Sequence, residues 1–123
     1  MTLKILAVGD IVGEPGIKMV EKHLRHIKKL NGVDFAVING ENASGVGITP
    51  GQAERIFASG ADVITLGNHT WNKISIKNYL DDCKYILRPA NYAPQVLGRF
   101  SMQKYRNMRN KLNRTLRYDI WAG

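Results

Sequence analysis

The chain has 123 residues with 44% hydrophobic and 23% charged side chains, which predicts one small globular domain and excludes a disordered or fibrous protein. Its net charge of +8 does not by itself indicate nucleic-acid binding, because residues 99–123 hold 7 Lys and Arg against 1 acidic residue, whereas residues 1–98 hold 11 against 9. The only early apolar run, residues 5–8, is too short for a signal sequence or a membrane span, so we expect a cytoplasmic protein.

The N-terminal part of the chain alternates strand and helix signals. Residues 3–8 are mainly apolar and predict a buried strand that ends before Asp10. A helix is expected from about Pro15, a residue suited to a first helical turn, and apolar residues at helical spacing continue it to Gly32. Residues 34–39 then predict a second strand.

A polar, glycine-rich loop, residues 40–47, separates the second strand from a second helix. Thr49 and Gln52 have the spacing of a capping box, and a proline stands at the first helical position between them. This helix should end near residue 60, and residues 62–66 predict a third strand.

The last regular elements expected are a short helix over residues 74–80 and a fourth strand over residues 84–87. Strands that alternate with helices through short loops indicate parallel βαβ units with right-handed crossovers. We therefore expect an α/β fold in which a parallel sheet with flanking helices occupies residues 1–98. Residues 99–123 form a separate basic tail.

Polar side chains follow each of the first three strands. Asp10 follows the first, Glu41 and Asn42 the second, and Asn68 and His69 the third. In an open α/β sheet, ligands bind in the crevice at the carboxyl ends of the strands. Neighbouring strands lie about 4.8 Å apart, so three strand ends cover roughly 10 Å, enough for two metal ions with a phosphate between them. Carboxylate, amide and imidazole ligands suit Mn²⁺ or Fe²⁺.

Each of these five side chains also has a simpler interpretation as a helix cap, a solvated loop or a plain turn, and only their joint position favours a site. The first loop, residues 9–16, matches neither the dinucleotide-binding fingerprint nor the P-loop. Its carboxylates, Asp10 and Glu14, would repel a bare phosphate, whereas an intervening metal would remove the conflict. A serine hydrolase is disfavoured because no serine lies in a nucleophile elbow.

Three other potentially reactive side chains are expected to have no role as metal ligands or catalytic groups. His23 and His26 lie on the predicted first helix, roughly 13 Å from the strand ends at ~1.5 Å per residue, so we interpret them as helix-surface or boundary residues. Cys83 is the sole cysteine, which excludes an internal disulfide and a cysteine-cluster metal site. We expect it to be a packed thiol and not a catalytic one.

Four motifs in order, GDIVGEPG, NGENASGVGITP, GNHTWN and RPANY, resemble the YmdB-like family of calcineurin-type metallophosphoesterases. The resemblance covers residues 1 to about 99. It implies the first half of an αββα sandwich, a site for two divalent metal ions, iron or manganese, and phosphodiesterase activity on substrates such as 2′,3′-cyclic nucleotides.

Carried over by position, the resemblance implies that Asp10, Glu41, Asn42 and Asn68 are metal ligands and that His69 is the catalytic histidine, donating a proton to the leaving oxygen. An imidazole can perform this step near neutral pH. Asn72 stands where members of the family often have aspartate, which we interpret as a change outside the ligand set.

The chain departs from the family in length, because members are about twice as long and the second half supplies three further histidine ligands. No histidine follows His69 here. We therefore expect a truncated and impaired enzyme, with an inactive remnant as the alternative. Self-association stays open.

The tail, residues 99–123, does not resemble the family, and we interpret it as a frameshift product. Its apolar residues at helical spacing, Tyr105, Met108, Leu112 and Leu116, predict one face of a basic helix. Such a helix offers another function, in which the tail alone contacts nucleic acid or a membrane surface.

Overall fold

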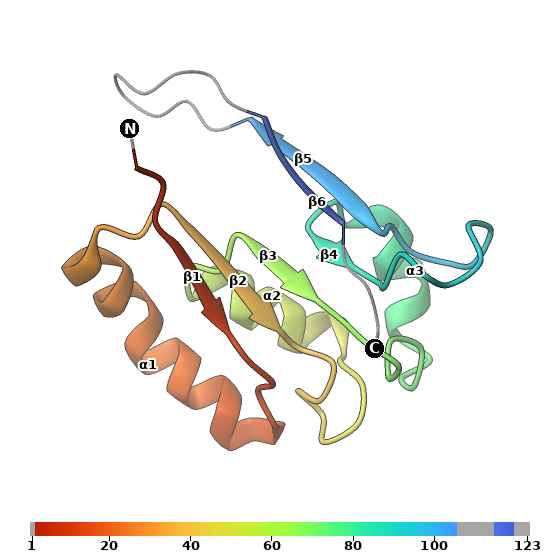
Figure 1. Cartoon of the computed structure of the whole chain (residues 1–123). Coiled ribbons are helices and arrows are strands. Elements are labelled where there is room, and N and C mark those ends of the chain that lie inside the picture. The colour runs from red at the N-terminus through yellow and green to blue at the C-terminus, as the bar shows by residue number, and fades with distance from the viewer. Residues whose placement is uncertain (1, 106–114, 120–123) are drawn as a thin grey trace.

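The computed structural model describes residues 2–105 and 115–119. A four-stranded sheet forms its centre, in the order β1-β2-β3-β4 with every neighbouring pair parallel. The strands are β1 (Ile5–Val8), β2 (Phe35–Asn39), β3 (Val63–Thr65) and β4 (Ile86–Leu87). Figure 1 shows them side by side in chain order, which confirms the predicted parallel α/β architecture.

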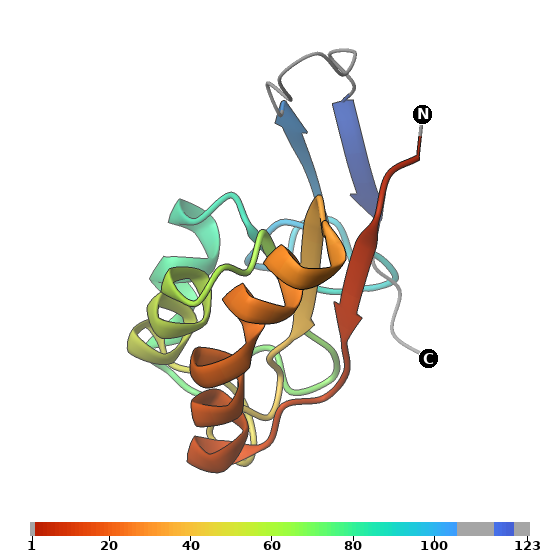
Figure 2. The same ribbon diagram turned by 90° about the vertical axis from the view of Figure 1, so that its left-hand side faces the viewer.

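The three helices are α1 (Gly13–Asn31), α2 (Pro50–Ala58) and α3 (Ile76–Asp82). Because each strand lies next to the one before it, right-handed crossovers place all three helices on the same face of the sheet (Figure 2). α1 ends at Gly32, which adopts the left-handed conformation that a C-terminal cap requires. The capping box of Thr49 and Gln52 at the start of α2 is formed as predicted.

The main core lies between the sheet and the helices, where Ile38, Ile64 and Ile86 from three neighbouring strands are fully buried. Phe35, Val63 and Leu87 form a smaller buried cluster. Because Phe35 lies three residues before Ile38 and Val63 one residue before Ile64, both odd separations, their side chains lie on the opposite face of the sheet.

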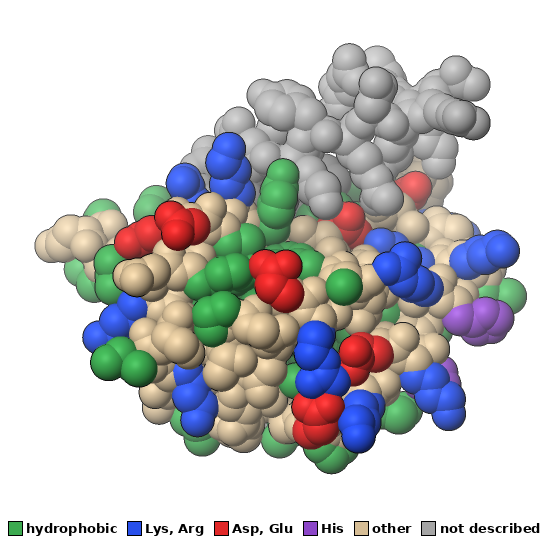
Figure 3. All heavy atoms as spheres, turned by 180° about the vertical axis from the view of Figure 1, so that it is seen from behind, with side chains coloured by type: hydrophobic (Ala, Val, Ile, Leu, Met, Phe, Trp, Pro, Cys, Tyr) green, Lys and Arg blue, Asp and Glu red, His purple; other side chains and the backbone are tan. Residues whose placement is uncertain are grey.

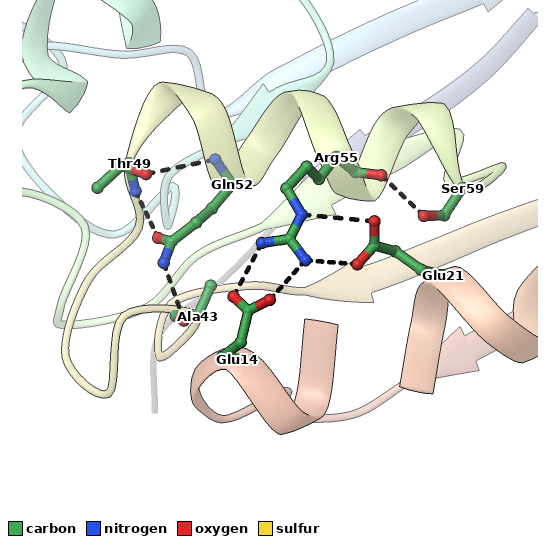
Figure 4. A network of polar contacts seen from close by, with 7 residues as sticks. All are labelled: Glu14, Glu21, Ala43, Thr49, Gln52, Arg55 and Ser59. Atoms are coloured by element: carbon green, nitrogen blue, oxygen red, sulfur yellow. Dashed lines mark hydrogen bonds and ion pairs between the residues drawn. The ribbon is translucent and has the colours of Figure 1, made fainter. Parts of the chain in front are cut away.

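An ion-pair cluster joins α1 to α2 (Figure 4). The Arg55 guanidinium donates to both carboxylate oxygens of Glu14, at 2.8 and 2.7 Å, and also contacts Glu21. This pairing lowers the pKa of Glu14 and raises that of Arg55. Glu14, which the sequence placed with Asp10 in the first loop, therefore lies in the first turn of α1 and pairs with Arg55 of α2.

The tail forms strands where the sequence predicted a helix. β5 (Ser101–Tyr105) and β6 (Thr115–Asp119) pair antiparallel in a sheet of their own. The predicted helix is therefore wrong at both of its ends, since Tyr105 and Leu116 lie in strands. Met108 and Leu112 fall outside the described residues.

The remaining expectations concern single side chains and membrane insertion. Cys83 is a free, half-buried thiol packed against the core, as expected. His23 is half-buried and His26 is exposed, which confirms their place on the surface or boundary of α1. Within the part of the chain that the structure describes, no helix is long and apolar enough to cross a membrane.

Candidate active site

Backbone hydrogen bonds hold the loops that follow β1 and β2 against each other and against the ends of β2 and β3. The Ile11 amide, just after β1, donates to the carbonyl of Asn39 at 3.2 Å. The Gly40 amide, just after β2, donates to the carbonyl of Thr65 at 2.9 Å. The Gly13 amide reaches the carbonyl of Asn42 at 3.0 Å. These bonds fix the loop positions from which the predicted site residues project.

Asn42 connects the first loop to the third. Its amide nitrogen donates to Oδ1 of Asp10 at 2.9 Å, and its amide oxygen lies 2.6 Å from Nδ1 of His69. Because an amide oxygen only accepts hydrogen bonds, Nδ1 of His69 carries a proton in this arrangement. The other ring nitrogen, Nε2, is then the atom at which His69 can accept or release a proton.

The Glu41 carboxylate lies beside the same histidine. Its Oε2 accepts a hydrogen bond from the backbone amide of His69 at 3.3 Å and lies 3.8 Å from Nδ1 of the ring. Gly67 makes this approach possible, since a Cβ at that position would lie 2.3 Å from Oε1 and 2.4 Å from Oε2. The glycine before Asn68 is therefore part of the site, because the carboxylate occupies the space of its missing side chain.

The structure thus brings four of the five predicted residues into one hydrogen-bonded cluster, which we call the strand-end cluster: Asp10, Glu41, Asn42 and His69. The fifth, Asn68, precedes His69 in the chain and is exposed. Among the described residues, its side chain makes no hydrogen bond to the other four. The amide–imidazole contact could not be read from the motifs, because it depends on side-chain orientation.

The donor set fits divalent metal ions. Two carboxylates and two amide oxygens are the oxygen ligands that Mn²⁺ accepts, and the carbonyl oxygen of Asn42 retains a second lone pair beside its bond to His69. The space over Gly67 keeps the Glu41 carboxylate at the strand ends. Over the described residues, no three His, Cys, Asp or Glu side chains are close enough to hold a metal by themselves. A metal ion bound at the strand ends would thus also use amide oxygens, and Asn42 and Asn68 are the amides predicted there.

A second loop supports the segment that carries His69. Trp71 donates from its indole nitrogen to the carbonyl of Leu97 at 3.2 Å, and its ring packs edge-on against Tyr92 with centroids 4.9 Å apart. The loop over residues 89–98 is in turn held by Arg88, which is fully buried and donates to four of its backbone carbonyl oxygens. This role of Arg88 was not predicted from the sequence, although the RPANY motif contains the residue.

The chain is thus an open parallel α/β protein with carboxylate, amide and imidazole side chains at three neighbouring strand ends, the edge at which such sheets bind ligands. The sequence profile of the YmdB-like protein family matches residues 6–113. The chain belongs to this family, which confirms the resemblance of the four motifs. The match continues into the segment 99–123, and a domain boundary at residue 98 stays a prediction.

Individual relatives agree with this assignment. The chain is 42% identical over 98 residues to the 2′,3′-cyclic-nucleotide 2′-phosphodiesterase of Bacillus subtilis (strain 168), and the match covers 79% of this chain and 37% of that protein. A hypothetical protein from Thermus thermophilus has a similar fold, with a TM-score of 0.83 and 27% identity. That match covers 97% of this chain and 44% of the Thermus thermophilus protein. A phosphatase from Mycoplasma pneumoniae also has a similar fold, with a TM-score of 0.78 and 26% identity. That match covers 87% of this chain and 40% of the phosphatase. The chain therefore spans less than half the length of these relatives.

Proposed function

We propose that the strand-end cluster is the part of a phosphodiesterase site that binds two divalent metal ions, iron or manganese, and that 2′,3′-cyclic nucleotides are its substrate class. The proposal depends mainly on the hydrogen bonds that join two carboxylates, an amide and an imidazole at three neighbouring strand ends. The name of the Bacillus subtilis relative supports the substrate class. When bound, such ions polarise the phosphoryl group and activate water.

The side chains divide into ligands and a proton carrier. Asp10, Glu41, Asn42 and Asn68 hold the ions, while His69 releases a proton from Nε2 to the leaving oxygen. The amide oxygen of Asn42, 2.6 Å from Nδ1, holds the ring so that Nε2 is free for this transfer. Glu41 fixes the backbone of the same residue through its 3.3 Å hydrogen bond.

We further propose that these 123 residues hydrolyse phosphodiesters weakly when alone. The four ligands bring two negative charges to two ions with a combined charge of about +4 and roughly ten coordination positions. Water can fill the vacant positions, but metal affinity falls when protein ligands are few. Residues 1–98 would then act as one part of the domain, with the basic segment 99–123 outside the site.

The test is a metal-titrated hydrolysis assay on the purified chain, with bis-para-nitrophenyl phosphate and a 2′,3′-cyclic nucleotide as substrates. We expect slow turnover that depends on Mn²⁺ or Fe²⁺ and is lost in His69→Ala. His26→Ala is the matched control, because His26 is exposed on α1 and has no place in the strand-end cluster. Turnover that survives His69→Ala would contradict the role of this residue.

Metal binding is measured separately by electron paramagnetic resonance of added Mn²⁺. Asp10→Asn and Glu41→Gln each remove one negative charge from the ligand set with little change in shape, so both should weaken Mn²⁺ binding without preventing folding. Equal Mn²⁺ affinity in these variants and in the unaltered chain would exclude the strand ends as the metal site.

A further inference from the structure

Gln52 makes more contacts than a helix cap requires. Its Oε1 accepts a hydrogen bond from the backbone amide of Thr49 at 3.0 Å, which completes the capping box at the start of α2 (Figure 4). The same oxygen accepts the hydroxyl of Ser44 at 2.5 Å, and Nε2 donates to the carbonyl of Ala43 at 3.3 Å. One side chain therefore joins the first turn of α2 to the loop that follows β2.

This loop carries two of the predicted ligands, Glu41 and Asn42, just before the residues that Gln52 contacts. The loop closes on itself through backbone bonds such as the one from the Gly47 amide to the carbonyl of Glu41 at 2.6 Å. Among the described residues, the hydrogen bonds that tie residues 43–47 to the chain outside this loop are those of Gln52. The side chain of Gln52 therefore anchors the loop beyond its two ligands.

The capping box alone does not require glutamine at this position. Glutamate serves equally well there, because the box uses one side-chain oxygen and the helix dipole favours a negative charge at a helix N-terminus. The backbone amide of Thr49 can only donate, so the atom that faces it is Oε1, and the NH₂ group then faces the carbonyl of Ala43. A carboxylate has no hydrogen to give to that carbonyl. The contact with Ala43 is therefore the one that depends on the amide of Gln52.

The position of the loop reaches the strand-end cluster through Asn42. The side chain of Asn42 donates to Asp10 at 2.9 Å and lies 2.6 Å from Nδ1 of His69. Bonds of this length are lost when the two atoms separate by about 1 Å more. The loop is also packed closely against the segment that follows His69, since a Cβ on Gly47 would lie 3.1 Å from the Cβ of Asn72. A small displacement of the loop would therefore break contacts that join the predicted site residues.

We propose that Gln52 is a positioning residue of the strand-end cluster. Its amide holds the loop so that Glu41 and Asn42 stay at the strand ends and Asn42 reaches His69. The proposal rests on the proposed function for the metal ions that Glu41 and Asn42 would bind, but the hydrogen bonds that it concerns form without metal.

Three variants separate positioning from capping. Gln52→Glu keeps the oxygen that caps α2 and removes the donor to Ala43, so its unfolding temperature should equal or exceed that of the unaltered chain. Figure 3 shows Lys and Arg side chains among Asp and Glu side chains over the helix side of the molecule, so one further carboxylate does not enter a field of like charge. Gln52→Met removes both functions. Thr49→Ala is the matched control, because it weakens the cap and leaves the contact between Gln52 and Ala43 in place.

The first readout is taken on the metal-free chain. We expect the backbone amides of residues 43–47 to exchange hydrogen about fivefold faster or more in Gln52→Glu and Gln52→Met, because a hydrogen bond that opposes local opening is lost. The side-chain amide resonance of Asn42 should shift in the same two variants. Thr49→Ala should instead speed exchange at the start of α2 and leave residues 43–47 unaltered. Unaltered exchange and an unaltered Asn42 resonance in Gln52→Glu would overturn the proposal.

The second readout is the Mn²⁺ affinity, measured by electron paramagnetic resonance. Gln52→Glu should lower this affinity about tenfold, as loss of a residue that orients metal ligands does. The added carboxylate attracts cations, so its charge cannot be the cause of weaker binding. An equal loss of affinity in Thr49→Ala would overturn the proposal, because capping would then explain both variants. If the unaltered chain binds no Mn²⁺, the proposed function fails, and the metal-free exchange at residues 43–47 still decides the role of Gln52.

Discussion

Replacing Gly67 by alanine places a methyl group where the Glu41 carboxylate lies. The new Cβ would be 2.3 Å from Oε1, 2.4 Å from Oε2 and 2.5 Å from Cδ, whereas ordinary contact begins at 3.4 Å. The carboxylate must therefore retreat by about 1 Å, and the 3.3 Å hydrogen bond from the His69 amide to Oε2 cannot survive that movement unchanged.

Two costs follow from this displacement. Overpacking of a buried position costs roughly 1–3 kcal/mol of folding free energy, and we expect Gly67→Ala to be destabilised by that amount. If the strand-end cluster hydrolyses phosphodiesters, a misplacement of about 1 Å at a ligand and beside the proton donor should also reduce turnover by roughly 10²-fold.

Urea denaturation followed by circular dichroism measures the first cost, and Gly51→Ala is the matched control. Gly51 lies in α2 with no atom within 4 Å of a Cβ built there, so its replacement should stabilise the helix by roughly 0.5–1 kcal/mol. The same change of residue thus has opposite expected signs at the two positions.

A second substitution tests the mechanism of the loss. Glu41→Asp shortens the side chain by one methylene and withdraws the carboxylate from Gly67. The double variant Gly67→Ala, Glu41→Asp should therefore be less destabilised than the sum of the two single variants. Gly67→Ala with unaltered stability and an unaltered amide resonance for His69 would refute the reasoning.

Three further predictions concern the framework around the site. Thr49→Ala removes the side-chain acceptor for the Gln52 amide and should lower the free energy of unfolding, measured by thermal denaturation, by about 1 kcal/mol. Thr49→Ser keeps the hydroxyl and should restore most of this loss. Arg88→Met leaves four backbone carbonyls without their donor and should lower the free energy of unfolding, measured by urea denaturation, by about 3 kcal/mol. Arg88→Lys should recover little of this stability, because an ammonium group lacks the planar fork of the guanidinium. Full recovery in Arg88→Lys would contradict this account. Arg55 lowers the pKa of Glu14 in the folded chain, so Glu14→Gln should be the less stable form above the ordinary value of 4.5. The difference should disappear as the pH falls through the folded-state pKa, measured by titration of the folded chain, and a difference that persists below that pKa would exclude the ion pair as its cause.

The sheet and its helices could be predicted from local signals because each signal acts over a few residues. The capping box of Thr49 and Gln52 places the start of α2, and Gly32 places the end of α1. The predicted strand at residues 84–87 is shorter in the structure, Ile86–Leu87. Boundaries of this kind depend on pairing with the neighbouring strand, which the sequence of one strand does not determine.

The tail was mispredicted because its apolar spacing suits more than one structure. Tyr105 and Leu116 lie at helical spacing from other apolar residues, but in the structure Tyr105 pairs with Thr115 and Leu116 with Lys104. Antiparallel pairing is a contact between distant segments, and periodicity along a single segment contains no information on it. The period of the apolar residues was therefore a weaker guide here than in α1, where a longer segment repeats it.

The side-chain contacts of the site show the same division between local and distant information. The strand-end rule correctly brought Asp10, Glu41, Asn42 and His69 to one edge, because it depends only on the order of the strands. It could not show that Asn42 bonds to both Asp10 and His69, since that contact requires the rotamers of three side chains. It also gave Gly67 no role, because the function of a missing Cβ appears only when its neighbour is placed.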